Sequence, residues 1–307
     1  MRKKPVLLVG DVIYDVHHYG KDKGFSIEAP VPVALHKCST ASWGGAGLVA
    51  RNLLALRKPV FFVSVVGADD YGREFLAWRS PNLIKKFFVD KNRHTMVKER
   101  FISGGKKVLR WNRGDSRPVD KRLEEKILTA IKRVLPHSSG VLIADYRHGL
   151  LARKLAQKIL KLAHQVGKEV WVDSQVTRGK ANHRWYKGAD FVCVNRNEAR
   201  SIDRRFDEKD IQNSLKRLQK ILNARNVTIK LGARGSASLL GKECVLTPAT
   251  RVKEVDAVGA GDAFFAALAK HGEISRQSLS YASRWAALAT TVSGTEPPTL
   301  SMLNKLK

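Results

Sequence analysis

The sequence is poor in cysteine, in acidic residues and in long apolar runs. Its three cysteines, Cys38, Cys193 and Cys244, are far apart and odd in number, which argues against a disulfide framework and a Cys-x-x-Cys zinc site. No apolar run reaches the roughly 18 residues that a membrane-spanning helix needs. The first apolar run, residues 6–9, is also shorter than the core of a signal peptide, so we expect a cytoplasmic protein without a membrane partner.

Acidic residues are scarce relative to basic ones, because 28 Asp and Glu stand against 56 Lys and Arg, for a net charge of +28. Such an excess attracts polyanions and phosphorylated ligands over long range, so nucleic-acid binding stays open as an alternative. The basic residues are nevertheless spread along the chain and form no tail or single arm. A generally basic surface is the simpler explanation of this distribution.

Short aliphatic runs alternate with longer helical patterns, which is typical of repeated β-α-β units around a mostly parallel sheet. Nearly uninterrupted apolar runs predict strands covered on both faces, at residues 6–9, 60–65, 141–144, 170–172, 191–194 and 227–231. Apolar positions at helical spacing predict helices at residues 48–56, 121–135, 151–166, 211–222, 263–269 and 279–289. We expect one α/β domain over residues 1–307, since no linker divides the chain.

Two stretches interrupt this alternation and have the character of antiparallel strands. Residues 30–35 carry two prolines, which fit an edge strand better than a central one. Residues 83–111 contain a Ser-Gly-Gly turn at 103–105, as in a β-hairpin. We predict a small β-sheet outside the main one, with strands near 30–38 and 83–111.

The most informative stretch, residues 256–264, is a small-residue loop that runs into an apolar helical segment. Gly259, Ala260 and Gly261 carry little or no side chain, so backbone amides there can approach an anion at the start of a helix. Phosphate would repel the acid at this junction, Asp262, but that acid is well placed to deprotonate a hydroxyl that attacks the phosphate. The alternative is a helix N-cap. We predict a phosphate site with Asp262 as general base.

This stretch resembles the C-terminal signature of the ribokinase-like carbohydrate kinases, Asp-Thr-x-Gly-Ala-Gly-Asp, which begins here at Asp256 and differs only at Ala257. The resemblance implies a ribokinase-like α/β fold, with a mostly parallel sheet flanked by helices and a small β-sheet lid. It also implies ATP as the phosphoryl donor with Mg²⁺, and an anion hole formed by the Gly-Ala-Gly segment for the transferred group. Because lids in this family often complete a neighbour's site, we expect a homodimer.

Two acids, Asp11 and Asp15, follow the first predicted strand, at the edge of an open α/β sheet where ligands usually bind. Carboxylates there can accept hydrogen bonds from sugar hydroxyls, and capping of a turn is the alternative. A glycine pair, Gly44 and Gly45, opens the next helical segment and can bring backbone close to a ligand. The family resemblance assigns both regions to the sugar. The asparagine of the family's Gly-Gly-x-x-Asn motif is displaced here to Asn52.

Two further motifs resemble those that bind the nucleotide in this family. Asn195 and Glu198 match an Asn-x-x-Glu motif that organises magnesium and phosphate through water, and a helix capping box is the alternative. Residues 230–235 resemble a Thr-x-Gly-x-x-Gly loop with lysine in place of threonine, while P-loop and dinucleotide fingerprints are absent. Glu198 is assigned to the metal. The residues assigned to the nucleotide are Asn195, Glu198, Lys230, Gly232, Gly235 and Asp256.

A narrower resemblance is to the heptose 7-phosphate kinases, whose equivalents of residues 28–33 and 141–149 read close to Glu-Ala-Pro-Val-Pro-Val and Leu-Ser-Asp-Tyr-x-Lys-Gly. The aspartate of the second motif is Asp145, which we assign to the substrate. Residues 170–173 are similar to a strand of that family that ends in Asp-Pro-Lys-Gly. The lysines of this motif and of the second motif are both missing here, replaced by Gln175 and His148. Candidate cations for a phosphorylated acceptor lie on the predicted hairpin, at Lys98, Arg100 and Arg110.

The sequence therefore predicts ATP-dependent phosphorylation of a sugar or sugar-phosphate hydroxyl. The narrower resemblance implies O1 of D-glycero-D-manno-heptose 7-phosphate, in the biosynthesis of an ADP-activated heptose. One alternative is a kinase of another sugar, such as fructose or ribose. The other is a kinase-like protein without catalysis that binds nucleic acid or a protein partner, and the intact segment 259–262 argues against it.

Overall fold

The computed structural model of the chain describes residues 4–177, 180–292 and 294–306. Its main sheet contains β1 (Val6–Gly10), β4 (Val60–Gly67), β5 (Leu83–Asp90), β8 (Val141–Asp145), β9 (Val170–Ser174), β12 (Phe191–Asn195), β13 (Asn226–Lys230), β14 (Ser236–Leu240) and β15 (Glu243–Thr247). Their order is β15-β14-β13-β12-β9-β8-β1-β4-β5. All neighbours from β13 to β5 are parallel, and β14 and β15 add an antiparallel edge.

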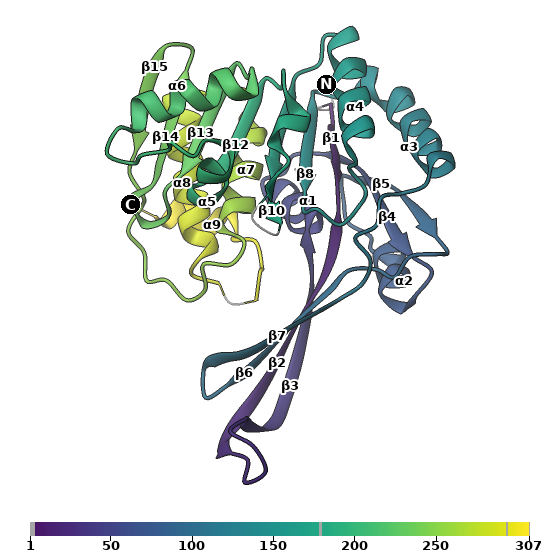
Figure 1. Cartoon of the computed structure of the whole chain (residues 1–307), viewed down its shortest axis with the longest axis vertical. Coiled ribbons are helices and arrows are strands. Elements are labelled where there is room, and N and C mark those ends of the chain that lie inside the picture. The colour runs from purple at the N-terminus through teal and green to yellow at the C-terminus, as the bar shows by residue number, and fades with distance from the viewer. Residues whose placement is uncertain (1–3, 178–179, 293, 307) are drawn as a thin grey trace.

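Helices cover both faces of this sheet (Figure 1). One face packs against α1 (Ala46–Ala55), α2 (Asp70–Ala77), α7 (Ala260–His271), α8 (Arg276–Ala289) and α9 (Leu300–Lys305). The other face packs against α3 (Lys121–Val134), α4 (Arg153–Gln165), α5 (Arg196–Ile202) and α6 (Ile211–Leu222). Side chains along a strand alternate between the two cores, so that Leu8 belongs to the first and Leu7 to the second.

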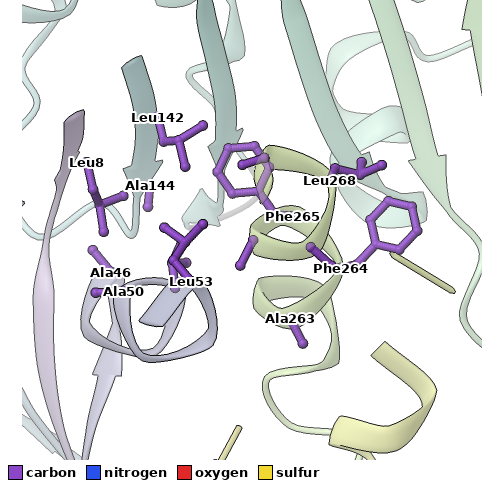
Figure 2. Close-up of a cluster of buried hydrophobic side chains, with 14 of the residues drawn as sticks. Leu8, Ala46, Ala50, Leu53, Leu142, Ala144, Ala263, Phe264, Phe265 and Leu268 are labelled. Carbon is purple, nitrogen blue, oxygen red and sulfur yellow. The ribbon is translucent and has the colours of Figure 1, made fainter. Parts of the chain in front are cut away.

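Short elements complete the chain: 3₁₀ turns at Leu135–His137, His183–Tyr186 and Gly232–Arg234, and the two-residue strands β10 (Val176–Thr177) and β11 (Lys180–Ala181). Figure 2 shows how α1 and α7 pack at the first core, where small residues alternate with large ones. Ala46 and Ala50 allow a close approach to the strands, and Leu53 and Phe265 fill the space near Leu142. This packing fixes the position at which α7 begins.

Four strands form a second sheet that reaches away from the body of the molecule (Figure 1). They are β2 (Val12–Phe25), β3 (Pro32–Gly45), β6 (Val97–Ser103) and β7 (Lys106–Arg113), in the order β3-β2-β6-β7. The chain enters this sheet directly from the end of β1 and leaves β3 directly into α1. The lid is therefore anchored at the edge of the main sheet where ligands are expected to bind.

The predicted strands and helices of the main body are confirmed, and so is the hairpin turn at residues 103–105. The assignment of residues 83–90 to the lid is wrong, because they form β5, which pairs in parallel with β4. Phe87 packs edge-on against Phe62 of β4, so one face of β5 is needed to cover the core. The sequence does not predict strand β2, since most residues after its short apolar start at Val12–Tyr14 are polar or glycine.

A buried polar contact joins α1 to α8 within the first core. The indole N–H of Trp285 donates to Oδ1 of Asn52 at 2.8 Å, and Asn52 Nδ2 donates to the carbonyl of Leu48 at 2.9 Å. Asn52 is 1% exposed and Trp285 is fully buried. The amide thus satisfies a buried donor that has no access to water.

Replacing this amide is expected to destabilise the fold. Asn52→Ala leaves the indole N–H without an acceptor, which should lower the free energy of unfolding by about 1–3 kcal/mol. Urea titration followed by circular dichroism measures the change. Asn304→Ala, at an exposed position of α9, is the control and should stay within about 0.5 kcal/mol of the wild type. Equal stability of the two variants would contradict the packing role of Asn52.

Candidate active site

A cavity of about 310 Å³ opens at the carboxyl ends of the parallel strands, between β8, β9, β12, β13 and the start of α7. This edge of an open α/β sheet is where ligands usually bind. The residues that line the cavity are Asp145, Tyr146, Asp173, Gln175, Asn195, Glu198, Lys230, Gly232, Gly259, Gly261 and Asp262. Eight of the residues predicted from the sequence as site residues are among them, although they come from segments far apart in the chain.

The start of α7 has the geometry of the predicted anion cradle. Gly259 caps the helix with a φ of 87°, a left-handed conformation that favours glycine, and a Cβ there would lie 2.6 Å from Leu48. The amide of Ala260 donates to the carbonyl of Ala257 at 3.3 Å, so it is engaged within the loop. Among the described residues, the amides of Gly261 and Asp262 have no such acceptor. The positive end of the helix dipole therefore carries free donors at this point.

Lys230 supplies a cation beside this cradle. Its Nζ lies 2.6 Å from Oδ2 of Asp173 and 3.3 Å from the position that a Cβ on Gly261 would take. Burial alone would lower the pKa of Lys230, but Asp173, Cys193 and Glu198 together raise it above its ordinary value. The lysine therefore stays charged, with an anion-binding helix start next to it.

Asp262 lies in the first turn of α7, facing the cavity. Burial raises the pKa of its carboxyl to about 7; the hydrogen bond from the Tyr146 hydroxyl and the charge of Lys230 oppose this effect, and Asp173 adds to it. The Tyr146 hydroxyl donates to Oδ1, and among the described residues Oδ2 has no hydrogen-bond donor. A carboxylate with a pKa near neutrality and one free oxygen is suited to accept a proton.

Asn195 and Glu198 form the capping box of α5. The Glu198 amide donates to Asn195 Oδ1 at 3.0 Å, and the Asn195 amide donates to a Glu198 carboxylate oxygen at 2.6 Å. Burial raises the pKa of Glu198 to about 7. No cluster of three or more His, Cys, Asp or Glu side chains among the described residues could hold a metal ion directly. Both residues nevertheless line the cavity, so the cap also contributes carboxylate and amide oxygens to the cavity wall.

On the lid side, Asp15 pairs with Arg100, whose Nη1 lies 2.6 Å from Oδ1. A Cβ on Gly44 would lie 1.8 Å from the other oxygen of Asp15, so only glycine leaves room for this carboxylate. Gly45, with a φ of 59°, caps α1. The predicted glycine pair thus shapes the backbone around Asp15, at the base of the lid.

The other two predicted substrate acids, Asp11 and Asp145, are both buried, and Asp145 lines the cavity. Asp11 accepts the amides of Tyr146, His148 and Leu150 at 3.0–3.2 Å. Burial, followed by the charge of Asp145, raises the pKa of Asp11 to about 6. What the structure shows is that Asp11 holds the loop after β8, and its predicted contact with a sugar stays a prediction.

Asp145 is 1% exposed, and its carboxylate accepts the Arg147 amide, the Ser174 hydroxyl and the Tyr186 hydroxyl at 2.8–3.0 Å. These three donors fix its orientation at the end of β8. The predicted sugar contact of Asn52 is not supported, since both polar atoms of its buried side chain are used between α1 and α8. Asn52 lies one helical turn after the position of the asparagine in the family's motif, and its side chain no longer faces the cavity.

Lys98 and His148 form a second polar cluster between the lid and the loop after β8. Lys98 is 8% exposed, and burial lowers the pKa of its ammonium to about 8. Both ring nitrogens of His148 are buried without a partner, and burial with the charges of Lys98 and Arg110 lowers its pKa to about 3. The cluster therefore holds hydrogen-bonding groups that the rest of the described chain leaves unsatisfied.

The predicted nucleotide loop contributes Gly232 to the wall of the cavity. Gly232 and Gly235 have φ values of 61° and 89°, and the amide of Gly235 closes a turn onto the carbonyl of Gly232 at 2.8 Å. Asp256 accepts from Lys107 of the lid hairpin at 3.1 Å. The first residue of the signature thus ties the lid to the loop before α7.

Sequence reasoning assigned no role to three residues that shape the site: Tyr146, Asp173 and Lys107. Tyr146 and Asp173 each come shortly after a predicted strand. The sequence therefore indicates at which edge of the sheet they lie, but not which residues they contact. Within the described ranges, none of the helices is long and apolar enough to span a membrane.

Comparisons with known proteins agree with this geometry. The HldE bifunctional protein of Nitrobacter winogradskyi is 33% identical over 310 residues, covering 98% of this chain and 63% of that protein. HldE of Helicobacter pylori strain HPAG1 is 31% identical over 269 residues, covering 86% of this chain and 57% of that protein. The chain spans between 40% and 63% of the length of such HldE relatives.

Solved structures show the same fold. Phosphofructokinase-2 from Escherichia coli in complex with potassium has a TM-score of 0.80 at 15% identity, covering 98% of this chain and 97% of that one. Arabidopsis thaliana ribokinase complexed with ribose and ATP has a TM-score of 0.74 at 19% identity, covering 99% and 98%. The predicted ribokinase-like α/β fold with a lid sheet is thus confirmed. Since the profile of the pfkB family carbohydrate kinases also matches residues 3–301, the chain belongs to this family of ATP-dependent sugar kinases.

Proposed function

We propose that the protein transfers the γ-phosphoryl group of ATP to O1 of D-glycero-D-manno-heptose 7-phosphate, a step toward ADP-activated heptose. The observation that carries the proposal is the carboxylate of Asp262, with its pKa near 7, at the mouth of a cradle that combines free amides with Lys230. The HldE relatives and the motif resemblance of residues 28–33 and 141–149 support the choice of acceptor.

In this proposal Asp262 Oδ2 takes the proton of the acceptor hydroxyl as its oxygen attacks the γ-phosphorus. The amides of Gly261 and Asp262 bind the transferred group, and Lys230 turns from Asp173 toward the phosphate oxygens. Asp15 and Arg100 orient the sugar from the lid side. The loop at Gly232 and Gly235, with Asp256, borders the nucleotide.

Magnesium fits the oxygen-rich wall of the cavity, since hard cations prefer carboxylate, amide and water oxygens. Glu198 and Asn195 would hold the hydrated ion, which neutralises triphosphate charge when bound. The hydrogen bonds between the two residues keep their oxygens fixed in position. The cytoplasmic location predicted from the sequence stays a prediction.

Removal of the base should abolish most of the turnover. Asp262→Asn keeps the size of the side chain but cannot accept the proton, so kcat should fall by roughly 10²- to 10⁴-fold. ATP binding, measured by calorimetry, should remain close to normal. Asp70→Asn on the exposed surface of α2 is the control and should keep full kcat. A near-normal kcat in Asp262→Asn would remove the assigned role.

A phosphorylated acceptor needs cations, and we assign that role to Lys98 and Arg110, with His148 as a neutral hydrogen-bonding neighbour. Register pairs Lys98 with Asp15 across β2 and β6, and Arg110 with Arg100 across β6 and β7. These side chains share one face of the lid, because alternate residues of a strand point the same way. An acceptor phosphate there would lie between two cations and would offer hydrogen-bond acceptors near His148, whose buried ring nitrogens have no partner among the described residues.

Lys98→Met tests this assignment. Loss of one charge-assisted hydrogen bond should raise KM for heptose 7-phosphate by about 10- to 100-fold and leave KM for ATP little changed. Lys106→Met, at the exposed end of the same hairpin, is the matched control and should leave both values unchanged. A panel with fructose and ribose, read by ADP release, separates the sugar-kinase alternatives. Equal effects of Lys98→Met on phosphorylated and unphosphorylated sugars would contradict a phosphate contact.

The opposite face of the lid supports the expected homodimer. Leu109 and Trp111 of β7 are 50% and 59% exposed, and they pair with Phe101 and Glu99, which alternate with Lys98 and Arg100 along β6. A projecting four-stranded sheet has no core of its own on this side, and apolar side chains gathered on it favour burial against another surface. We propose a second copy of the chain as that surface, because the same apolar lid on each copy is self-complementary.

Sedimentation velocity measures the predicted assembly. The wild type should sediment as a species with twice the mass of the chain. Trp111→Glu should sediment as a monomer, because burying an unpaired charge in the dimer interface is costly. Ile84→Glu, which adds the same charge at an exposed apolar position of β5, should remain dimeric. A monomeric wild type would contradict the proposed dimer and would leave the catalytic role of Asp262 unaffected.

A further inference from the structure

The loop after β8 is held in one conformation by buried acids. Three of its amides donate to Asp11, and the Arg147 amide donates to Asp145 at 2.9 Å. Arg147 has a φ of 66°, which costs a non-glycine residue about 1–3 kcal/mol. Gly149 has a φ of 92°, and a Cβ there would lie 2.0 Å from the carbonyl of Arg117. These hydrogen bonds keep the loop in a strained conformation. We therefore expect one side chain of the loop to need a fixed position in the site.

That side chain is Tyr146. It is 7% exposed, and its hydroxyl donates to Oδ1 of Asp262 although the two residues are 116 positions apart in the chain. Burial, and then the charge of Asp262, raise the pKa of the Tyr146 phenol well above its ordinary value. The phenol therefore keeps its proton and acts only as a donor to the carboxylate.

Other charged groups also face Asp262 from every side of the cavity. The acids are Asp15 from β2, Asp173 from β9 and Glu198 from α5, and the bases are Lys230 from β13 and Lys98 from β6. The acids favour protonation of Asp262, while the two ammonium groups and the Tyr146 hydroxyl favour its charged form. Tyr146 is the neutral member of this set, and it contacts the carboxylate directly.

We propose that Tyr146 is a positioning residue, whose hydroxyl fixes the Asp262 carboxylate through Oδ1 and leaves Oδ2 for the acceptor alcohol. The inference rests on the proposed function. It deepens that function because it assigns different tasks to the two oxygens of the base. In the transfer step the acceptor O–H bond breaks and its proton passes to Oδ2, the acceptor oxygen bonds to the γ-phosphorus, and ADP leaves with the electron pair of the broken P–O bond. The phenol proton stays on Tyr146 throughout.

Carbon-13 NMR of the protein labelled at aspartate carboxyls tests the inference without any substrate. The Asp262 resonance is assigned by its absence from Asp262→Asn, and its titration midpoint in the wild type is expected near 7. Tyr146→Phe removes a hydrogen bond to the charged form, so the midpoint should rise by about one pH unit or more. The carboxylate would then be lost at a higher pH than in the wild type.

Tyr186→Phe is the matched control, since this buried tyrosine donates in the same way to a different aspartate, Asp145, at 2.8 Å. It should leave the Asp262 midpoint in place even where it lowers stability. If Tyr146→Phe does not fold, 3-fluorotyrosine at position 146 keeps the shape with a more acidic phenol, and the midpoint should fall. An unchanged midpoint in a folded variant at position 146 overturns the inference.

Kinetics separates this inference from the proposed function. With heptose 7-phosphate as acceptor, the acid limb of kcat/KM against pH should move up in Tyr146→Phe together with the NMR midpoint. No turnover of this sugar by the wild type would sink the proposed acceptor and leave the NMR result standing. A wild type that needs Asp262 but shows the same acid limb in Tyr146→Phe would sink the role of Tyr146 alone.

Discussion

The positive charge of Lys230 stabilises several carboxylates at the edge of the main sheet where the parallel strands end. Lys230 contacts Asp173 directly, and its charge also acts on Glu198 and Asp262. Because burying like charges together is unfavourable, each proton or anion that enters this cavity changes the state of the others. An arriving phosphate would compete with Asp173 for the lysine, while Asp262 is poised near neutrality to release or accept a proton. In the proposed reaction, anion binding and proton transfer would thereby be coupled.

The lid completes this arrangement from outside the sheet. Its inner face carries Asp15, Arg100 and Lys98, and the charges of Asp15 and Lys98 act on Asp262. Lys107 joins the turn of the β6–β7 hairpin to the loop before α7 through Asp256. The strands of the lid continue directly from β1 and into α1, so a displacement of the lid acts on the backbone around the site.

Much of the fold could be predicted from the sequence, because strands covered on both faces need apolar runs and helices repeat their apolar positions. The main sheet and its six predicted strands follow from this rule. The rule fails where a strand is only half covered: β2 carries polar residues on its face toward the site, and β5 alternates at the sheet edge. The cradle could be predicted from the glycine-rich signature alone. Its free backbone amides belong to the start of a single helix and do not depend on distant segments of the chain.

Contacts between distant segments could not be predicted in the same way. The hydrogen bond between Tyr146 and Asp262, and the ion pair between Lys107 and Asp256 across 149 positions, depend on how the sheet is assembled. The most direct measurement of the central claim is a crystal structure with a non-hydrolysable ATP analogue. The account predicts the γ-phosphate at the amides of Gly261 and Asp262, with Lys230 turned from Asp173 to the phosphate. A nucleotide bound elsewhere, or Lys230 still on Asp173, would contradict it.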